Sequence, residues 1–293
     1  MKKIGFIDYF LSEWHADNYP AWIDEISVKY GLDFKVAYAY AEKDVSPRDG
    51  VTTDEWCGKF GVERCGSIAE LCEKSDFIVI LSPDNAENHL RYALEVIPYG
   101  KPVYVDKTFT PTLAEAQKIF DAAAAHGTPL CSTSALRCAD ELRDFRDSVS
   151  SEKTAFASGM AVSGSGSSFD NYAVHQIEMM VVCMGSRPER VMGLQNGGIK
   201  SFVVEFEGAR RALFTQPVGS RTPFAVSIEK DGENTSEYRA IKSEFFKNFI
   251  HEMLIFFETG KPIATREETL AVIAIIEAGR KALERPGEWV KVF

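Results

Sequence analysis

Residues 100–130, GKPVYVDKTFTPTLAEAQKIFDAAAAHGTPL, predict a complete strand–helix–strand unit. Two short apolar strands are expected in it, at Val103–Val105 and Pro129–Ser132. Between them, Thr112-Leu-Ala-Glu115 is a capping box that starts a helix, and Gly127 is suited to end it. Because consecutive parallel strands need a long crossover connection, this unit predicts a parallel sheet covered by helices.

The same alternation extends through the first half of the chain. Further strands are expected at Ile4–Ile7, Phe34–Tyr40 and Phe77–Leu81, with helices between them. Residues 1–134 are therefore predicted to form a Rossmann-type, doubly wound parallel sheet.

After Ser134 the pattern changes. A helix is expected at about 136–149 and another at Tyr172–Met184. Strands then follow one another at Glu189–Leu194, Ser201–Glu207, Arg210–Gln216 and Phe224–Glu229, and two helices close the chain. Residues 135–293 are predicted to form an α+β domain with an open, mostly antiparallel sheet for substrate binding and oligomerisation.

The composition restricts the possible partners and location. Of 293 residues, 45% are hydrophobic and 26% charged, as in ordinary globular proteins, and the net charge of −10 argues against nucleic acid and anionic membranes. The six cysteines show no CxxC pair or zinc-type spacing, so reduced, buried thiols and a cytoplasmic location are expected. No metal site is expected either, because the acids and histidine of residues 8–17 match no standard ligand spacing.

Four segments stand in an order that is typical of one enzyme family. In chain order, ILSPDNAENHLRYAL, 80–94, resembles a strand-end Thr-Pro-Asn segment, and residues 100–130 resemble a segment with a Glu-Lys-Pro motif. NYAVHQIEMMVVCMG, 171–185, is similar to an Asp-x-x-x-His-x-x-Asp helix, and 245–284 to a closing helix pair. The family with these features is the Gfo/Idh/MocA oxidoreductases, which include glucose–fructose oxidoreductase and inositol dehydrogenase.

The resemblance implies a function for each domain. The first would be a Rossmann domain for NAD or NADP, and the second would bind a small-molecule substrate. The reaction would transfer a hydride to or from a hydroxyl or carbonyl carbon of a small polyol, sugar or related metabolite. The open sheet of the second domain would support a homodimer or homotetramer.

The resemblance also places the catalytic residues. Lys107 occupies the position of the family's lysine, where it could hydrogen-bond the reacting oxygen. His175 matches the catalytic histidine, which could take a proton from a substrate hydroxyl. Asn171 stands where the family has aspartate, and it could orient a hydroxyl without holding a charge. The alternatives are a solvated loop lysine and a satisfied core histidine.

Three further residues are candidates for binding substrate. Arg137 falls at the expected domain junction and could bind a carboxylate or hydroxyls, although a surface salt bridge is an equal alternative. Asp170 is one position from the family's aspartate and could replace it if the turn is shifted. Glu178 lies on the same helical face as His175.

The stretch KIGFIDYFLSEWHADNYPAWIDEI, 3–26, stands where a glycine-rich phosphate loop is expected. No glycine follows Gly5, although glycines let the backbone approach a pyrophosphate at a helix N-terminus. Asp8 and Glu13 add negative charge there, at a cost on the order of 1 kcal/mol per close charge pair. A bound cofactor would need an altered loop, rebuilt from Ser12, Trp14 and His15, with Asp8 and Ser12 as predicted cofactor contacts.

The other expected cofactor contacts lie at strand ends. An acid should end the second strand and hold the adenosine ribose, but Tyr40 stands near that point and Glu42 comes later. By resemblance, Ser82 and Pro83 would flank the nicotinamide, and Asp106 would precede the catalytic lysine. Two functions stay open: an NAD(P)-dependent oxidoreductase with an altered loop, or a non-catalytic ligand-binding or regulatory protein with a degenerate cofactor site. An enzyme that binds another nucleotide, or none, is a third possibility.

Overall fold

The chain folds into two compact units. The computed structural model describes residues 1–149, 156–164, 166, 168–194, 197–217, 222–230 and 236–293. The first unit comprises Met1–Thr110, Ala114–Thr133 and Phe249–Thr265, and the second comprises Pro111–Leu113, Ser134–Asn248 and Arg266–Phe293. The first unit thus takes in Phe249–Thr265, which the expected boundary at residue 134 assigned to the second domain.

A parallel sheet forms the centre of the first unit, as the sequence predicts. Its strands are β1 (Lys2–Asp8), β2 (Phe34–Ala41), β3 (Glu63–Arg64), β4 (Phe77–Ile80), β5 (Val103–Val105) and β6 (Leu130–Cys131). They lie in the order β3-β2-β1-β4-β5-β6, and every neighbouring pair is parallel. This is the strand order of the Rossmann fold, in which the direction of winding reverses between β1 and β4.

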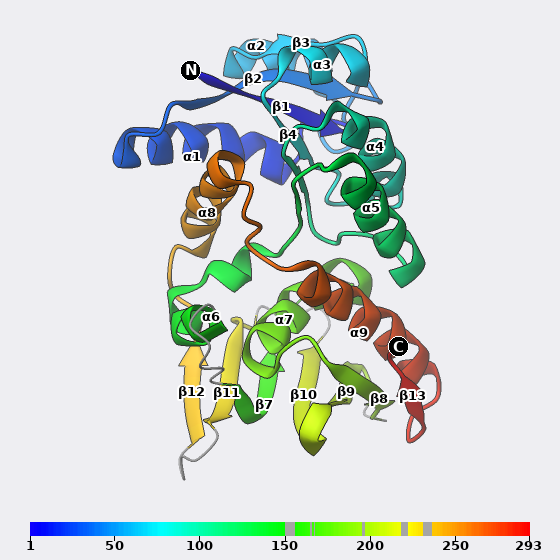
Figure 1. Ribbon diagram of the computed structural model, residues 1–293. Coiled ribbons are helices and arrows are strands. Elements are labelled where there is room, and N and C mark those ends of the chain that lie inside the picture. Colours follow the sequence, from blue (N-terminus) through cyan, green and yellow to red (C-terminus); the bar gives the residue numbers. More distant parts are fainter. Residues whose placement is uncertain (150–155, 165, 167, 195–196, 218–221, 231–235) are drawn as a thin grey trace. The chain divides into compact units, whose positions relative to one another are not determined.

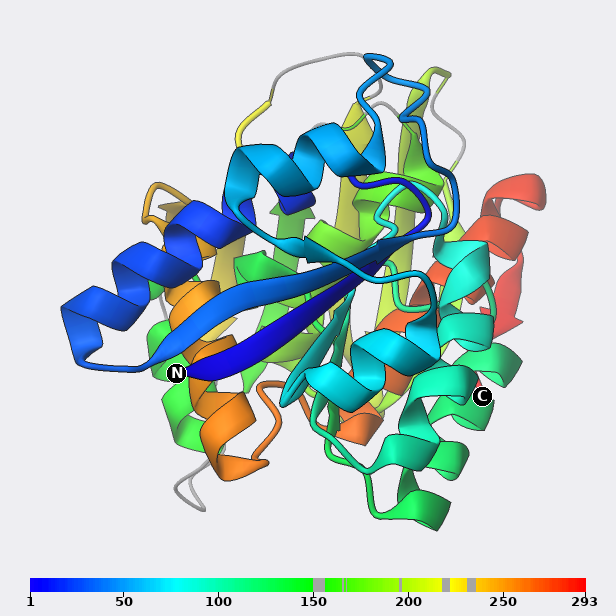
Figure 2. The same cartoon turned by 90° about the horizontal axis from the view of Figure 1, so that it is seen from above.

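Helices and buried rings complete this unit. The helices are α1 (Trp14–Tyr30), α2 (Thr53–Phe60), α3 (Ile68–Lys74), α4 (His89–Val96), α5 (Leu113–His126) and α8 (Phe245–Thr259). Figure 2 shows α1 beside β1 and β2. From α8, the Phe249 ring lies 6.0 Å from that of Tyr19 and 5.1 Å from that of Tyr104. These contacts explain why most of α8 belongs to the first unit.

The second unit contains a mixed, mostly antiparallel sheet. Its strands are β7 (Ala157–Ser163), β8 (Pro188–Gly193), β9 (Ile199–Phe206), β10 (Arg210–Pro217), β11 (Ala225–Lys230), β12 (Ser236–Ala240) and β13 (Trp289–Lys291). The order is β12-β11-β7-β10-β9-β8-β13, and the β7–β10 pair is the parallel one among the described pairs. The prediction of an open, mostly antiparallel sheet is confirmed.

The helices of this unit are α6 (Arg143–Val149), α7 (Phe169–Met184) and α9 (Arg266–Glu284). Figure 1 shows α7 and α9 lying over one face of the second sheet. The helix expected at 136–149 is wrong in its first half, where 3-10 turns at Ala135–Cys138 and Asp140–Leu142 precede α6. Ala139 is extended between the two turns (φ −63°, ψ 136°), which prevents a continuous helix.

Two general properties follow from the described residues. No helix in the described part of the chain combines the length and apolar character needed to cross a bilayer. All six cysteines are buried and form no disulfide bond, as expected.

Candidate functional site

In the first unit, polar residues gather at the carboxyl ends of four neighbouring strands. Asp8 ends β1, Glu42 follows β2, Ser82 lies just beyond β4, and Asp106 follows β5. In doubly wound sheets, ligands bind in the crevice outside these ends, where the winding reverses. Here that point lies between β1 and β4.

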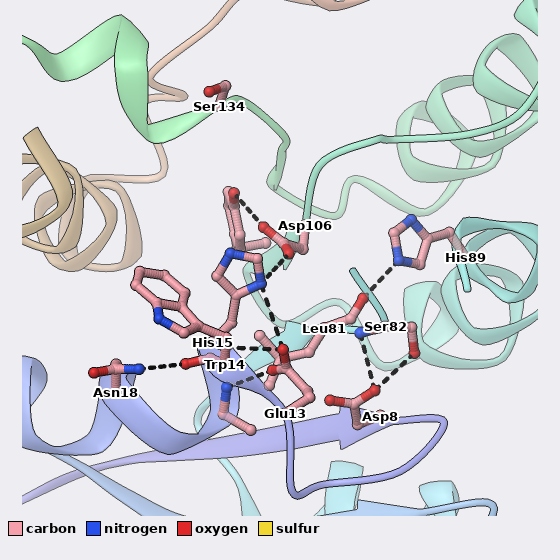
Figure 3. Close-up of polar contacts among 12 residues, drawn as sticks. Asp8, Glu13, Trp14, His15, Asn18, Leu81, Ser82, His89, Asp106 and Ser134 are labelled. Atoms are coloured by element: carbon pink, nitrogen blue, oxygen red, sulfur yellow. Dashed lines mark hydrogen bonds and ion pairs between the residues drawn. The ribbon is translucent and has the colours of Figure 1, made fainter. Parts of the chain in front are cut away.

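Asp8 and Ser82 bridge the two strands at this point (Figure 3). Asp8 Oδ1 accepts hydrogen bonds from the Tyr9 amide at 2.6 Å, the Ser82 amide at 3.0 Å and the Ser82 hydroxyl at 3.1 Å. Asp8 Oδ2 is buried and has no hydrogen-bond partner within the described residues. Burial, and then the charge of Glu13, raise the pKa of Asp8 well above its usual value. Ser82 has a left-handed backbone (φ 63°), which these hydrogen bonds help to hold.

The Glu13 side chain accepts hydrogen bonds from the backbone amides at the start of α1. Glu13 is the N-cap residue, and its carboxylate accepts hydrogen bonds from the His15 amide at 2.8 Å and from the Ala16 amide. Its side chain is 1% exposed, and burial raises its pKa. The amides of the first helical turn, which would face a pyrophosphate in a Rossmann domain, are therefore bonded to a carboxylate of the chain itself.

His15 forms an ion pair with Asp106 across the same edge. His15 Nδ1 lies 3.1 Å from Asp106 Oδ2 and 3.7 Å from Glu13 Oε2 (Figure 3). Asp106 is 1% exposed, and its other carboxylate oxygen lies 3.3 Å from the Tyr104 hydroxyl. Burial opposes ionisation of Asp106, but the charge and hydrogen bond of His15, together with the charges of Lys107 and His89, outweigh burial and lower the pKa of that carboxyl. The predicted cofactor contact Asp106 thus has a partner within the protein.

His89 contacts two segments that carry predicted site residues. The first, after β4, carries Ser82 and Pro83, and the second, after β5, carries Lys107. The His89 imidazole is fully buried, with Nδ1 2.9 Å from the Phe109 carbonyl oxygen and Nε2 2.5 Å from the Leu81 carbonyl oxygen. Burial lowers its pKa. Pro83 is buried in the first of these segments. Lys107 is half-buried in the second, and the peptide bond that follows it is cis.

Glu42 lies closer to the end of β2 than the sequence predicted. Tyr40 lies inside β2, which continues to Ala41, so Glu42 is the first residue beyond the strand. The Glu42 carboxylate accepts hydrogen bonds from Arg91 and from the Tyr92 hydroxyl, the latter at 2.8 Å. The bond from Arg91 is the main cause of its lowered pKa. Glu42 is therefore the first residue beyond β2, where an acid that binds ribose is expected in a Rossmann fold, and the sequence prediction ended this strand one residue too early.

The loop between β1 and α1 also offers backbone donors. Within the described residues, the amides of Phe10, Leu11 and Ser12 donate no hydrogen bond. The Ser12 hydroxyl donates to Asp49 Oδ2 at 2.7 Å. Consecutive amides in a turn are a common anion-binding feature.

A dinucleotide fits these residues in part. The free amides of the loop, and Glu42 beyond β2, match what its phosphates and ribose require. The buried carboxyls of Asp8 and Glu13 fit a pyrophosphate only in their protonated forms, because as anions they would repel it.

In the second unit, His175 of α7 contacts Ser134, the residue at which the chain enters this unit after Thr133. His175 Nδ1 lies 2.8 Å from Ser134 Oγ, and Ser134 also accepts a hydrogen bond from the Leu136 amide at 3.2 Å. The imidazole is half-buried, with its centroid 5.6 Å from that of Phe224. His175 is therefore a partly accessible histidine with an anchored partner. No role was predicted for Ser134 from the sequence, although a serine before a short helical turn is a typical N-cap.

Arg137 and Glu178 form a buried charge cluster with Glu268 of α9. Arg137 Nε donates to Glu178 Oε1 at 2.6 Å, and Nη1 donates to Glu268 Oε1 at 2.9 Å. Arg137 is 4% exposed, and the two carboxylates outweigh burial and raise its pKa. The salt bridge considered from the sequence exists, but it is buried and not on the surface. A substrate contact of Arg137 or Glu178 remains a prediction.

The remaining predicted residues lie near the start of α7. Ser168 caps the helix by accepting a hydrogen bond from the Asn171 amide at 3.2 Å, and the Asn171 side chain is exposed one turn before His175. The side chain of Asp170 lies outside the described residues. Within the described chain, no group of three or more His, Cys, Asp or Glu side chains could hold a metal ion.

Comparison with known proteins extends these observations. The sequence profile of an oxidoreductase family with an NAD-binding Rossmann fold, GFO_IDH_MocA, matches residues 45–134. No curated protein matches the sequence significantly.

The chain is similar in fold to several solved structures. A probable dehydrogenase from Thermotoga maritima shares 14% identity over 99% of this chain and 98% of that chain, with a TM-score of 0.78. Scyllo-inositol dehydrogenase from Lactobacillus casei with bound NAD(H) and scyllo-inositol shares 14% identity over 99% of each chain, with a TM-score of 0.77. An oxidoreductase from Agrobacterium radiobacter in complex with NAD+, L-tartaric acid and magnesium shares 13% identity over 99% of this chain and 98% of that chain, with a TM-score of 0.73.

At these identities the structural likeness establishes the fold. The sequence match includes the segments that carry Ser82, Asp106 and Lys107. Residues 45–134 thus match the model of the Gfo/Idh/MocA oxidoreductase family, which is described by an NAD-binding Rossmann fold, and the chain as a whole shares the fold of solved dehydrogenases.

Proposed function

We propose that this protein is an NAD(P)-dependent oxidoreductase that transfers a hydride to or from a small polyol, sugar or related hydroxylated metabolite. The observation that carries the proposal is the position of Lys107. It lies directly beyond Asp106 at the carboxyl edge of the parallel sheet, inside the segment that matches the family. The buried contacts of His89 and Asp106 fix the chain on both sides of this lysine.

Each of the predicted catalytic residues would have its own role in this reaction. A bound nicotinamide would supply the hydride acceptor or donor. Lys107 of the first unit would donate a hydrogen bond to the reacting oxygen and stabilise its developing charge. His175 of the second unit would accept the hydroxyl proton, with Ser134 holding its ring. Asn171 and Asp170 precede it on α7 and are candidates for orienting the substrate.

A second candidate function is a non-catalytic ligand-binding or regulatory protein on the same scaffold. The observation that favours it is the carboxylate of Glu13, which already occupies the amides at the start of α1. If no dinucleotide binds, Lys107 and His175 have no hydride chemistry to assist.

A titration with NADH and with NADPH distinguishes the two candidates. We expect saturable binding of one of them in the micromolar range, which is typical of enzyme ligands, measured by nucleotide fluorescence. Lys107→Met should bind the nucleotide as wild type does, because its proposed contact is with the substrate. Absence of binding at millimolar nucleotide, throughout the neutral and mildly acidic range, would refute the NAD(P)-dependent oxidoreductase.

We also propose that the second sheet joins subunits into a homodimer or homotetramer. α7 and α9 cover one face, where Phe202 and Phe214 are buried and their rings stack with centroids 4.4 Å apart. On β10, Leu213 points to the opposite side and is 36% exposed.

Light scattering after gel filtration tests this assembly. We expect wild type to have at least twice the monomer mass, and Leu213→Glu to shift it toward the monomer because a charge would be buried. Leu94→Glu, an exposed leucine on α4 of the first unit, is the control and should keep the wild-type mass. A monomeric wild type would refute the proposed assembly.

A further inference from the structure

We propose that the first unit takes up a proton when it binds the pyrophosphate of a dinucleotide, and that the Asp8–Glu13 pair holds this proton. The inference deepens the oxidoreductase proposal and rests on it. It names a condition for cofactor binding that the family's glycine-rich loop does not need, because glycines contribute no acid to that turn.

The geometry of the β1–α1 turn is the basis of this inference. Asp8 ends β1, and Glu13 caps α1, so the two carboxyl groups lie at the two ends of the turn where a Rossmann domain holds the pyrophosphate. Both are buried, at 2% and 1% exposure. Figure 3 shows them on the same side of the chain, with one Asp8 oxygen bonded to Ser82 and the other directed toward Glu13.

Charges from every neighbouring element have to be counted. The turn contributes Asp8 and Glu13, and α1 contributes His15 and Tyr19. The segment after β2 contributes Lys43, beside the Tyr9 ring, and Asp49, bonded to Ser12, and the segment after β5 contributes Asp106 and Lys107. His15 is the basic side chain within 4 Å of Glu13, but its Nδ1 lies closer to Asp106 Oδ2, at 3.1 Å, than to Glu13 Oε2, at 3.7 Å. Phosphate charge added to this turn therefore has to be balanced by protonation of the Asp8–Glu13 pair.

Protonation also supplies the contacts that an anion needs. Asp8 Oδ2, without a hydrogen-bond partner in the described structure, would become a donor to a phosphate oxygen. Neutral Glu13 would bind the amides of His15 and Ala16 less strongly, so that they could turn to the phosphate. Burial already raises the pKa of both groups, which lowers the cost of adding the proton.

The direction of the pH effect follows from linkage. Because the bound state holds more protons than the free state, affinity is greatest at low pH and is lost as the pH rises through the pKa of the pair. One linked proton changes the dissociation constant by up to about tenfold per pH unit. Adenosine, which lacks phosphate, should show no such dependence.

The experiment is calorimetric titration with ADP-ribose, which carries the pyrophosphate but no nicotinamide. It is performed from about pH 6 to about pH 8.5, in buffers of different ionisation enthalpy that report protons taken up. We expect wild-type affinity to fall as the pH rises, with uptake approaching one proton. Asp8→Asn and Glu13→Gln remove the acids but keep hydrogen-bonding groups, so each should bind more tightly at the highest pH and show a flatter profile. Asp24→Asn, an exposed acid on α1, is the matched control and should behave as wild type.

The outcomes separate this inference from the proposed function. ADP-ribose binding that is equally tight at every pH, with no proton uptake, would overturn the inference and leave the oxidoreductase proposal standing. No binding at the lowest pH by wild type or by either variant would overturn both.

Discussion

We expect His175→Asn to lower kcat by roughly 10²- to 10⁴-fold, the usual contribution of a general acid–base group. Asparagine is polar and of similar size, but it cannot accept and return a proton near neutral pH. Cofactor affinity should stay within about twofold of wild type, because the first unit is unchanged. Steady-state kinetics with the polyol or sugar that wild type oxidises, together with NADH titration, measure both quantities.

Variants of Ser134 test whether this residue positions the His175 imidazole. Ser134→Ala removes the 2.8 Å contact with Nδ1, so the pH profile of kcat should shift, and Ser134→Thr should restore much of it. The exposed His126→Asn, at the end of α5, is the control and should leave kcat unchanged. Unchanged turnover in His175→Asn would contradict the role proposed for it.

We expect Arg137→Met to destabilise the second unit by about 3–5 kcal/mol, because it leaves Glu178 and Glu268 near each other without their cation. Urea unfolding followed by circular dichroism measures this loss. The double variant Arg137→Met, Glu178→Gln should recover part of this loss, since one of the two carboxylates that Arg137 bonded is then replaced by a neutral amide.

The control is an ion pair with similar chemistry on the surface. Arg187 Nη1 lies 3.0 Å from Glu207 Oε1, with side chains 75% and 58% exposed. Arg187→Met should therefore cost less than about 1 kcal/mol. Equal losses in the Arg137 and Arg187 variants would contradict a structural role for the buried cluster.

The long strands and helices of both units were predicted well from the sequence, whereas short strands and a helix break were missed. Long apolar patterns with capping signals, such as α5 and its flanking strands, are encoded locally and were found. The short strands β3, β12 and β13 were missed, because two to five residues carry too little periodicity. The break at Ala139 was missed because no glycine or proline marks it.

The candidate site likewise contains residues that local motifs indicated and residues that only the fold brings together. Motifs within one segment indicated Lys107 and His175, and those roles remain predictions. Glu13 was seen only as a misplaced charge, because glutamate is not among the favoured N-cap residues. The His15–Asp106 pair joins residues far apart in the chain, and nothing near either position predicts the other.

The sequence by itself determined the order of the longer strands and helices, the family resemblance and the absence of glycine from the β1–α1 turn, since each is a property of neighbouring residues. Only the tertiary structure decided what replaces that glycine: Glu13 bonded to the helix amides and Asp8 bonded to Ser82. The physical reason is burial. Packing removes these carboxyls from water, and burial raises the pKa of each, so an acid that looks like a fixed negative charge in the sequence becomes a group that can take up a proton.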